Sequence, residues 1–359
     1  MCCQDQQYIY TNNRAEKQHS EQIQLNFKMP NTNSEKGFTG INTSTRLAGL
    51  LGHPVGHSVS PYLQNFLAEK YGINMAYLGF DIAEGKLEDA VKGGLAMNAI
   101  GFNVTVPYKK DVMEYLAGID PVAKKIGAVN TLKPEADGFH GYNTDMPGFG
   151  RALDHAGIDV KERCVVMIGA GGAANAVLCS LLEKGAKNIL LLNRTVEKAE
   201  ALADRFRSDY PDSRIFTAPL TGNADNTAKD SAESKPYLKS MDDISADKWI
   251  AIQCTSVGMS PNTDEASIND DGFYERLDAA FDIIFNPEET LFLKKAREHG
   301  AKVSNGLGML MFQGIRSFEI WNSLDVSDDI ADELLSGMRE EVKKNTVKKA
   351  VSRSESLVL

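Results

Sequence analysis

Short apolar blocks alternate with longer amphipathic stretches along the first part of the chain. Three of these blocks predict strands: residues 45–52, residues 75–80 and residues 103–106, the last ended by Pro107. Residues 57–71 predict a loop followed by a helix, with Ser60 placed to cap the helix and Gly72 placed to end it. Strands that alternate with helices predict an α/β domain with mostly parallel strand pairing.

A second alternating unit begins at Arg163. Its strands are predicted at residues 164–168, 188–192, 250–253 and 279–285, and its helices at residues 172–184, 195–207 and 308–321. Residues 164–168 are apolar throughout, which is typical of a parallel strand covered on both faces. A strand, a glycine-rich loop, a helix and a second strand within about 30 residues predict a nucleotide-binding unit.

Three segments lack this patterning. Residues 1–44 are polar and predict a disordered leader, and residues 343–359 predict a frayed basic tail. Residues 221–236 predict a polar surface insertion.

Composition narrows the class of protein. The net charge of −10 over 359 residues argues against nucleic acid as a partner, because phosphate binding needs a basic face. No apolar run approaches the roughly 18 residues of a membrane span. The five cysteines are odd in number, and their spacing fits neither a disulfide framework nor a metal site, so a reducing cytoplasm is expected.

The glycine-rich loop is formed by Gly169, Ala170, Gly171, Gly172 and Ala173. It reads G-x-G-x-x-A, with Ala174 in the third position. Gly169 permits the tight turn, and Gly171 lets backbone amides approach a pyrophosphate at the start of the helix. Since the flanking strands and helix are present, the loop predicts a dinucleotide site rather than a structural turn.

The end of the second strand of this unit indicates which dinucleotide is bound. An acid there would bind the ribose hydroxyls of NAD, whereas this chain has Asn193, Arg194 and Thr195, with Lys198 one turn later. A guanidinium and a hydroxyl suit a 2′-phosphate, so NADP is expected. The alternative is that Arg194 is only a solvated residue at the start of a helix.

Lys109 and Asp145 are candidates for handling a proton beside the nicotinamide. Taken alone, Lys109 could be a surface lysine and Asp145 a helix cap. Each lies in a compact polar segment near a strand end, and ligands bind at the carboxyl ends of strands in open α/β sheets. His57 could also be considered as a base, but a loop histidine beside a serine favours a structural role.

The motifs taken together resemble those of the shikimate dehydrogenase family. The matching strings are GHPVGHSVSP (52–61), GFNVTVPYKK (101–110), GAVNTL (127–132), GYNTD (141–145), IGAGGAA (168–174), NRT (193–195), CTSVGM (254–259) and NGLGMLMFQG (305–314). They cover about residues 46–325 in order.

The resemblance implies an α/β fold with an N-terminal substrate domain, a Rossmann domain that binds NADP, and a C-terminal helical return to the first domain. Residues 45–147 and 312–342 would form the substrate domain, and residues 148–311 the NADP domain. The implied activity is the reversible NADPH-dependent reduction of 3-dehydroshikimate to shikimate in aromatic amino-acid biosynthesis.

The resemblance also implies roles for single residues. Lys109 and Asp145 would be the catalytic pair, and Ser58 and Ser60 would bind the substrate carboxylate. The other residues implied to contact or line the substrate are Thr105, Asn130 and Gln313. Those implied near the cofactor, beyond the loop and Asn193–Lys198, are Thr255, Met259 and Gly308.

Phe285 departs from the family pattern. The family usually has a tyrosine there, whose hydroxyl helps to hold the substrate carboxylate. Two alternatives therefore stay open beside shikimate dehydrogenase: a quinate/shikimate dehydrogenase, against which Asn193 and Arg194 argue, and a catalytically silent NADP-binding regulator. The small-molecule substrate is the expected partner, with a homodimer compatible with the sequence.

Overall fold

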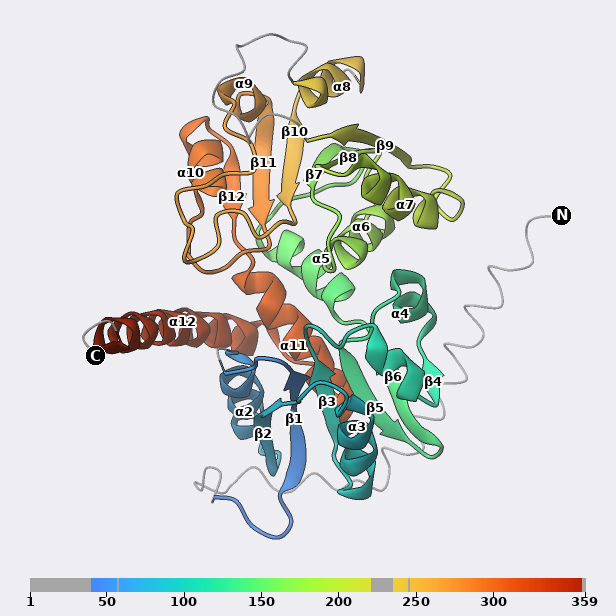
Figure 1. The fold of residues 1–359 in the computed structure, drawn as a ribbon, viewed down its shortest axis with the longest axis vertical. Helices are drawn as coiled ribbons and strands as arrows, with labels where there is room; N and C mark the ends of the chain where they lie inside the picture. The colour runs from blue at the N-terminus through green and yellow to red at the C-terminus, as the bar shows by residue number, and fades with distance from the viewer. Residues whose placement is uncertain (1–39, 57, 221–234, 245, 357–359) are drawn as a thin grey trace, which may run out of the picture. The chain divides into compact units, whose positions relative to one another are not determined.

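The computed structural model describes residues 40–56, 58–220, 235–244 and 246–356, with side chains up to residue 345. Two six-stranded sheets, each with its own helices, make up the described chain (Figure 1). The predicted leader lies outside the described residues except for residues 40–44, and so does most of the predicted 221–236 insertion.

The first sheet has the strand order β2-β1-β3-β5-β6-β4. Its strands are β1 (Arg46–Gly52), β2 (Met75–Asp81), β3 (Gly101–Val104), β4 (Gly118–Ile119), β5 (Thr131–Glu135) and β6 (Gly138–Tyr142). Its helices are α2 (Ser60–Lys70), α3 (Leu87–Ala96), the 3-10 helix η1 (Asp111–Tyr115) and α4 (Pro121–Ile126). β2, β1 and β3 pair in parallel, whereas β5 pairs antiparallel with both β3 and β6.

β4 and β6 pair in parallel, so three of the five strand pairs of this sheet are parallel, which agrees with the predicted mostly parallel pairing. The sequence did not predict β4, β5 and β6 themselves. β6 alternates between buried and partly exposed positions, whereas β5 runs from buried to exposed. Neither carries a continuous apolar run, so their strand signal is weak. The predicted capping role of Ser60 is wrong, since Ser60 is the first residue of α2. Its backbone N–H instead donates to Ser58 Oγ at 3.1 Å.

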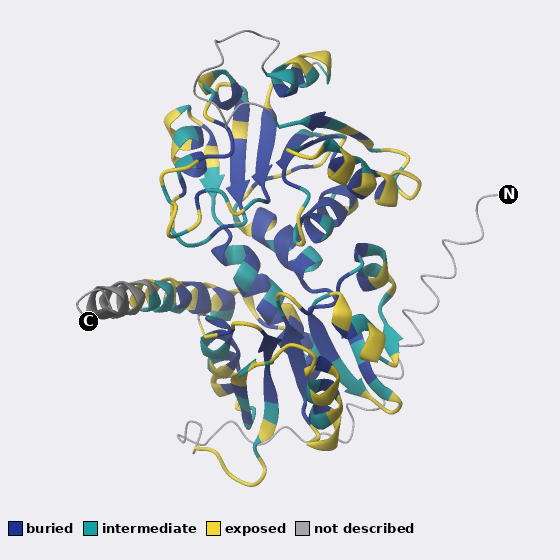
Figure 2. Ribbon diagram, viewed as in Figure 1, coloured by how far each residue is buried: buried dark blue, intermediate teal, exposed yellow. Residues whose placement is uncertain are grey.

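The second sheet is parallel throughout and has the order β12-β11-β10-β7-β8-β9. Its strands are β7 (Cys164–Ile168), β8 (Asn188–Asn193), β9 (Arg214–Pro219), β10 (Trp249–Gln253), β11 (Leu277–Asp282) and β12 (Lys302–Ser304). Its helices are α6 (Ala174–Glu183), α7 (Val196–Arg207), α8 (Pro236–Ile244), α9 (Asp271–Tyr274) and α10 (Leu291–Glu298). The central strands are buried on both faces (Figure 2). This arrangement confirms the α/β unit of Rossmann type that the sequence predicted.

β11 ends three residues earlier than predicted, so Phe285 lies in the following loop. The buried carboxylate of Asp282 accepts hydrogen bonds from the Ile284 backbone N–H at 2.9 Å and the Thr290 hydroxyl at 2.7 Å. These bonds turn the chain out of the sheet, because an N–H bound to a side chain cannot join the strand ladder.

Two helices, α5 (Asp145–His155) and α11 (Leu307–Asn322), pack against each other and connect the two sheets in sequence (Figure 1). Arg151 of α5 forms an ion pair with the buried Glu319 of α11 at 3.2 Å. Met311, Ile315 and Phe318 are buried, as their common helix face predicted. The domain limits expected at 147/148 and 311/312 fall inside these helices.

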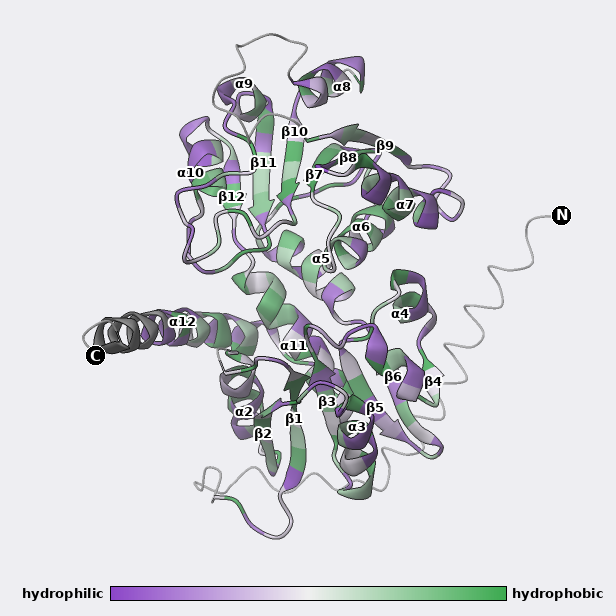
Figure 3. Cartoon of the chain, in the orientation of Figure 1, coloured by the Kyte–Doolittle hydropathy of each residue, from purple (hydrophilic) through white to green (hydrophobic). Residues whose placement is uncertain are grey.

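The last helix, α12 (Asp328–Ser356), continues through most of the run that we expected to fray. No glycine or proline follows Gly337, and lysine, arginine and glutamate favour helix, so nothing in the sequence stops it earlier. The part of this helix that Figure 3 colours carries both hydrophilic and hydrophobic residues. Within the described residues, no helix combines the length and apolar character needed to cross a membrane.

Candidate active site

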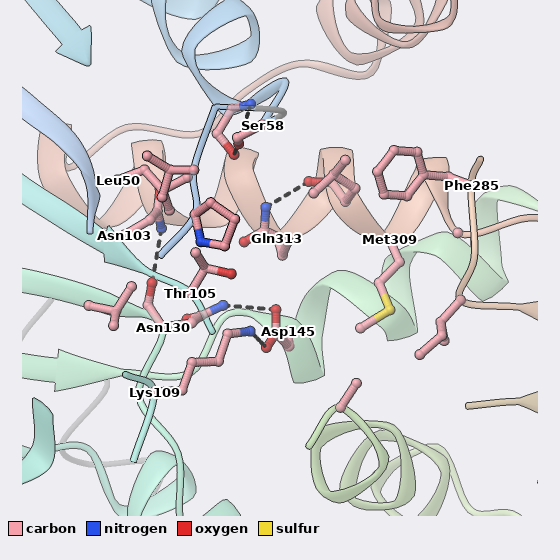
Figure 4. A pocket seen from close by; sticks show the side chains of 18 residues that line it. Leu50, Ser58, Asn103, Thr105, Lys109, Asn130, Asp145, Phe285, Met309 and Gln313 are labelled. Carbon is pink, nitrogen blue, oxygen red and sulfur yellow. Dashed lines mark hydrogen bonds and ion pairs between the residues drawn. The ribbon is translucent and has the colours of Figure 1, made fainter. Parts of the chain in front are cut away.

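A cavity of about 360 Å³ lies where the loops after β1, β3 and β11 meet α5 and α11. Its walls include all eight residues predicted to be catalytic or to contact substrate: Ser58, Ser60, Thr105, Lys109, Asn130, Asp145, Phe285 and Gln313. Figure 4 shows these side chains coming from segments far apart in the sequence. The fold therefore collects the predicted polar residues in one place.

Lys109 and Asp145 are in direct contact. Lys109 Nζ lies 2.6 Å from Asp145 Oδ2, and the side chains are 30% and 12% exposed. Asp145 is the first residue of α5, where the partial positive charge of the helix end favours a carboxylate. The lysine thus reaches the cavity while its partner stays largely shielded from water.

Asn130 fixes the other oxygen of this carboxylate. Its Nδ2 donates to Asp145 Oδ1 at 2.9 Å. Its own Oδ1 accepts from the Thr144 backbone N–H at 2.8 Å and from the Thr131 hydroxyl at 3.0 Å. The amide orientation is therefore determined on both sides, and Asp145 is held by Asn130 and Lys109 together.

A buried polar cluster behind Asn130 supports this arrangement. Asn103 donates to Ser317 Oγ at 2.8 Å and to the Asn130 carbonyl at 3.1 Å, and it accepts from the Tyr77 hydroxyl at 2.9 Å. We did not predict this cluster. One signal was available, because Ser317 lies four residues after Gln313 and therefore on the same face of the helix.

Ser58 and Ser60 present hydroxyls at another part of the cavity. The Ser58 hydroxyl donates to Ser60 Oγ at 3.0 Å. Gln313 donates to the Leu310 carbonyl at 2.8 Å, which leaves its amide oxygen as an acceptor. Phe285 and Met309 form an apolar part of the wall (Figure 4). Met309 and Leu310 line the cavity without having been predicted.

The glycine-rich loop has the geometry that a dinucleotide needs. Gly169 adopts φ +103°, which a side chain would disfavour, and a Cβ there would lie 2.7 Å from Thr255 Cγ2. The backbone at Gly171 and Gly172 faces open space, and α6 begins directly after the loop, at Ala174. Ala173 lines the cavity that holds Lys109, so the loop adjoins the catalytic candidates.

The residues predicted to select the cofactor lie at the start of α7. Arg194, Thr195 and Lys198 are exposed, and Asn193 Nδ2 donates to the Thr195 carbonyl at 2.8 Å. Met259 is 47% exposed and Gly308 lies in the first turn of α11. Among the described residues, these six positions and Thr255 are not part of the wall around Lys109, so their predicted contacts with cofactor stay predictions.

No group of three or more potential metal-ligating side chains occurs in the described part of the chain. Behind the Phe285 loop, burial raises the pKa of Asp282 to about 7. The pKa of the Cys254 thiol is also raised, mainly by burial and to a smaller extent by the negative charge of Asp282. Both groups are buried, so they do not face the cavity as reactants.

Two family models match the chain. The shikimate dehydrogenase substrate binding domain matches residues 50–132, and the shikimate / quinate 5-dehydrogenase model matches residues 152–216. The shikimate dehydrogenase (NADP(+)) of Methanococcus aeolicus is 39% identical over 79% of this chain and 94% of its own length. The enzyme of the same name from Caldanaerobacter subterraneus is 38% identical over 83% and 99%.

A solved structure gives the same result. Shikimate 5-dehydrogenase from Listeria monocytogenes, in complex with shikimate and NAD, superposes with a TM-score of 0.72 at 32% identity. The superposition covers 82% of this chain and 98% of that one. The similarity thus extends over both sheets and nearly the full length of the relatives, and the chain belongs to the shikimate dehydrogenase family.

Proposed function

We propose that the chain catalyses the reversible NADPH-dependent reduction of 3-dehydroshikimate to shikimate, a step of chorismate and aromatic amino-acid biosynthesis. The observation that carries this proposal is the Lys109–Asp145 pair in a cavity with the Ser58 and Ser60 hydroxyls. Curated relatives at 38–39% identity bear the name of this enzyme over nearly their whole length.

The first sheet would bind the substrate. The Ser60 hydroxyl can donate to a carboxylate, and the Ser58 hydroxyl can do so once it turns away from Ser60 Oγ. Thr105, Asn130 and Gln313 face the cavity with groups suited to the hydroxyls of a cyclitol. These hydrogen bonds would fix the orientation of the substrate ring, so that its reacting carbon is held at a constant position relative to Lys109.

Lys109 would exchange a proton with the substrate oxygen during the reaction. In the reductive direction its ammonium polarises the carbonyl and gives up a proton as the alcohol forms. Asp145 orients Lys109 through the 2.6 Å contact and accepts a hydrogen bond from a substrate hydroxyl. The hydrogen bond from Asn130 keeps the Asp145 carboxylate directed at Lys109 and at the substrate hydroxyl.

The cofactor would supply or accept the hydride when bound. The residues present fit NADP: the Gly169–Ala173 loop and the start of α6 suit a pyrophosphate, and exposed Arg194, Thr195 and Lys198 suit a 2′-phosphate. Thr255, Met259 and Gly308 are proposed to contact the rest of the dinucleotide. The Methanococcus aeolicus relative bears the name shikimate dehydrogenase (NADP(+)), and the Listeria relative was solved with NAD.

One other function has an observation in its favour, and a second is disfavoured. Quinate is a candidate substrate, because the second family model covers both shikimate and quinate enzymes and Phe285 removes a hydroxyl from the cavity. A catalytically silent NADP-binding regulator is disfavoured by the intact Lys109–Asp145 pair, since a silent protein has no need of both side chains.

One experiment separates these functions: the rate at which nicotinamide absorbance changes with shikimate or quinate and with NADP or NAD. Activity with shikimate and NADP supports the proposal. A higher kcat/KM for quinate supports the second function, and binding of NADPH without turnover of either acid supports the regulator.

We also propose a homodimer and a reducing compartment such as the cytoplasm. β2 is an edge strand with Leu78 49% exposed, a surface that a second copy could cover. The three described cysteines are free thiols. Light scattering of the purified chain, compared with a Leu78→Lys variant, tests the dimer.

A further inference from the structure

The C-terminal end of α4 is held by residues from the helices of the second sheet. Arg205 Nη1, in the last turn of α7, donates to the Ile126 carbonyl at 2.8 Å. Lys125 Nζ lies 3.0 Å from Asp209 Oδ2 and 4.6 Å from the centre of the Tyr210 ring. Two consecutive residues of α4 therefore dock on α7 and on the turn that follows it.

Gly127 shapes this contact. It ends α4 with φ +73°, and a Cβ at this position would lie only 2.7 Å from Arg205 Nη1. Glycine thus provides both the left-handed turn and the space that the guanidinium occupies. Arg205 also binds a carbonyl that the end of the helix leaves without an intrahelical partner.

The segment that follows Gly127 leads directly to the catalytic candidates. The Val129 backbone N–H donates to the Lys109 carbonyl at 2.8 Å. The Asn130 side chain donates to Asp145 Oδ1 at 2.9 Å. A shift of residues 127–130 would therefore move the backbone of Lys109 and the carboxylate of Asp145 together.

The other end of α7 carries the residues proposed to bind the 2′-phosphate, since Thr195 directly precedes the helix. We propose that Arg205 is a positioning residue: through it, α7 holds residues 126–130 in the geometry that aligns Lys109 and Asp145 with substrate. This inference rests on the proposed function. It states that Arg205, which does not line the cavity, affects the rate of the reaction.

The test compares Arg205→Ala with the wild-type chain in shikimate oxidation. We expect kcat to fall about 2- to 30-fold, the range seen for residues that couple sites without touching ligand. The KM for shikimate should change little, because the groups that line the cavity remain. With shikimate deuterated at the carbon that gives up hydride, the isotope effect on kcat should rise, because a misaligned pair slows the chemical step.

Arg207→Ala is the matched control. Arg207 occupies the same end of α7, but its hydrogen bonds within the described part of the chain go to Glu200, Asp204 and the Ile215 carbonyl, all in α7 and β9. It should keep wild-type kcat and isotope effect. Arg205→Lys should recover part of kcat, because an ammonium can still donate to the Ile126 carbonyl.

Amide hydrogen exchange supplies a readout that does not need turnover. In Arg205→Ala, the amides of Gly127, Val129 and Asn130 should exchange faster, whereas those of the second sheet should not. The proposal is overturned if Arg205→Ala keeps wild-type kcat and isotope effect, or if Arg207→Ala has the same effect. An inactive wild-type chain would instead refute the proposed function, and exchange would still decide whether Arg205 tethers the segment.

Discussion

The side-chain amide of Asn130 donates to Asp145 Oδ1 at 2.9 Å, while Lys109 Nζ lies 2.6 Å from the other oxygen of the same carboxylate. Asp145 is thus held from two directions, by one neutral donor and one charged donor. In the proposed mechanism this relationship separates two tasks: Asn130 sets where the carboxylate lies, and Lys109 is the group that we propose exchanges a proton.

Replacing Lys109 with alanine should lower kcat by roughly 10²–10⁴, the usual range for a positioned proton-transfer group. Lys109 is not part of a hydrophobic core, so the melting temperature should stay near that of the wild type. Lys110→Ala removes the neighbouring exposed lysine and should leave kcat nearly unchanged. Asp145→Asn should also lower kcat strongly. The variant that combines Lys109→Ala with Asp145→Asn should lose less activity than the product of the two single effects. Near-native turnover of Lys109→Ala would exclude the assigned role.

Replacing Arg194 with alanine should raise the KM for NADP and leave the KM for NAD almost unchanged. The reason is that a guanidinium binds the 2′-phosphate, a group that NAD lacks. Steady-state rates with both cofactors in the same variant provide the internal control. Equal changes for the two cofactors would show that Arg194 does not distinguish them.

Replacing Phe285 with tyrosine should lower the KM for shikimate roughly tenfold or more with little change in kcat, because one hydrogen bond from a hydroxyl to a charged carboxylate contributes about 1.5–3 kcal/mol net. The double variant Ser58→Ala with Ser60→Ala should raise the KM more strongly, since a charged group then loses two donors. If Phe285→Tyr impairs activity with shikimate, the substrate assignment is in error, and a panel of cyclitol acids should reveal a better substrate.

The stability of the fold should depend on the protonation of Asp282. Burial raises the pKa of Asp282 from 3.8 to about 7. Between these two pH values the carboxyl group keeps its proton in the folded chain and has released it in the unfolded chain. The free energy of unfolding, relative to Asp282→Asn, should therefore be highest below about pH 4 and fall as the pH rises through 7, by about 1.4 kcal/mol per pH unit at most. Asp278→Asn, an exposed position on the same strand, is the control. A pH-independent difference between Asp282→Asn and the wild type would contradict this expectation.

Much of the second sheet could be predicted from the sequence because its strands are buried on both faces. Residues 164–168 and 189–192 are continuous apolar runs, and the observed strands match the predicted strands 164–168 and 188–192 within one residue. β5 and β6 were missed because a half-exposed strand of five residues resembles a loop in composition. Apolar patterning was therefore most informative where burial is complete, although it also located the partly exposed β2.

The cavity residues could be predicted from motif strings, whereas their support could not. Lys109, Asp145 and Asn130 were named from short polar segments, and all three line the cavity. Asn103 and Ser317, which hold Asn130 from behind, are separated by more than 200 residues in sequence, and only the fold shows that they touch. The hydrogen bond from Arg205 to the Ile126 carbonyl likewise joins residues far apart in sequence and could not be predicted from it.

The helices α5 and α11 determine how this chain can be divided. The polypeptide leaves the first sheet through α5 and returns through α11, so the second sheet is an insertion rather than a tail. A single cut in the chain cannot separate the second sheet from the first. The two points where the chain passes between the sheets lie in α5 and α11, and these helices pack against each other. A truncated chain ending before α11 would also lose Met309, Leu310 and Gln313 from the cavity. Exchange of the cofactor-binding half between relatives would consequently require two simultaneous crossovers, one in each helix.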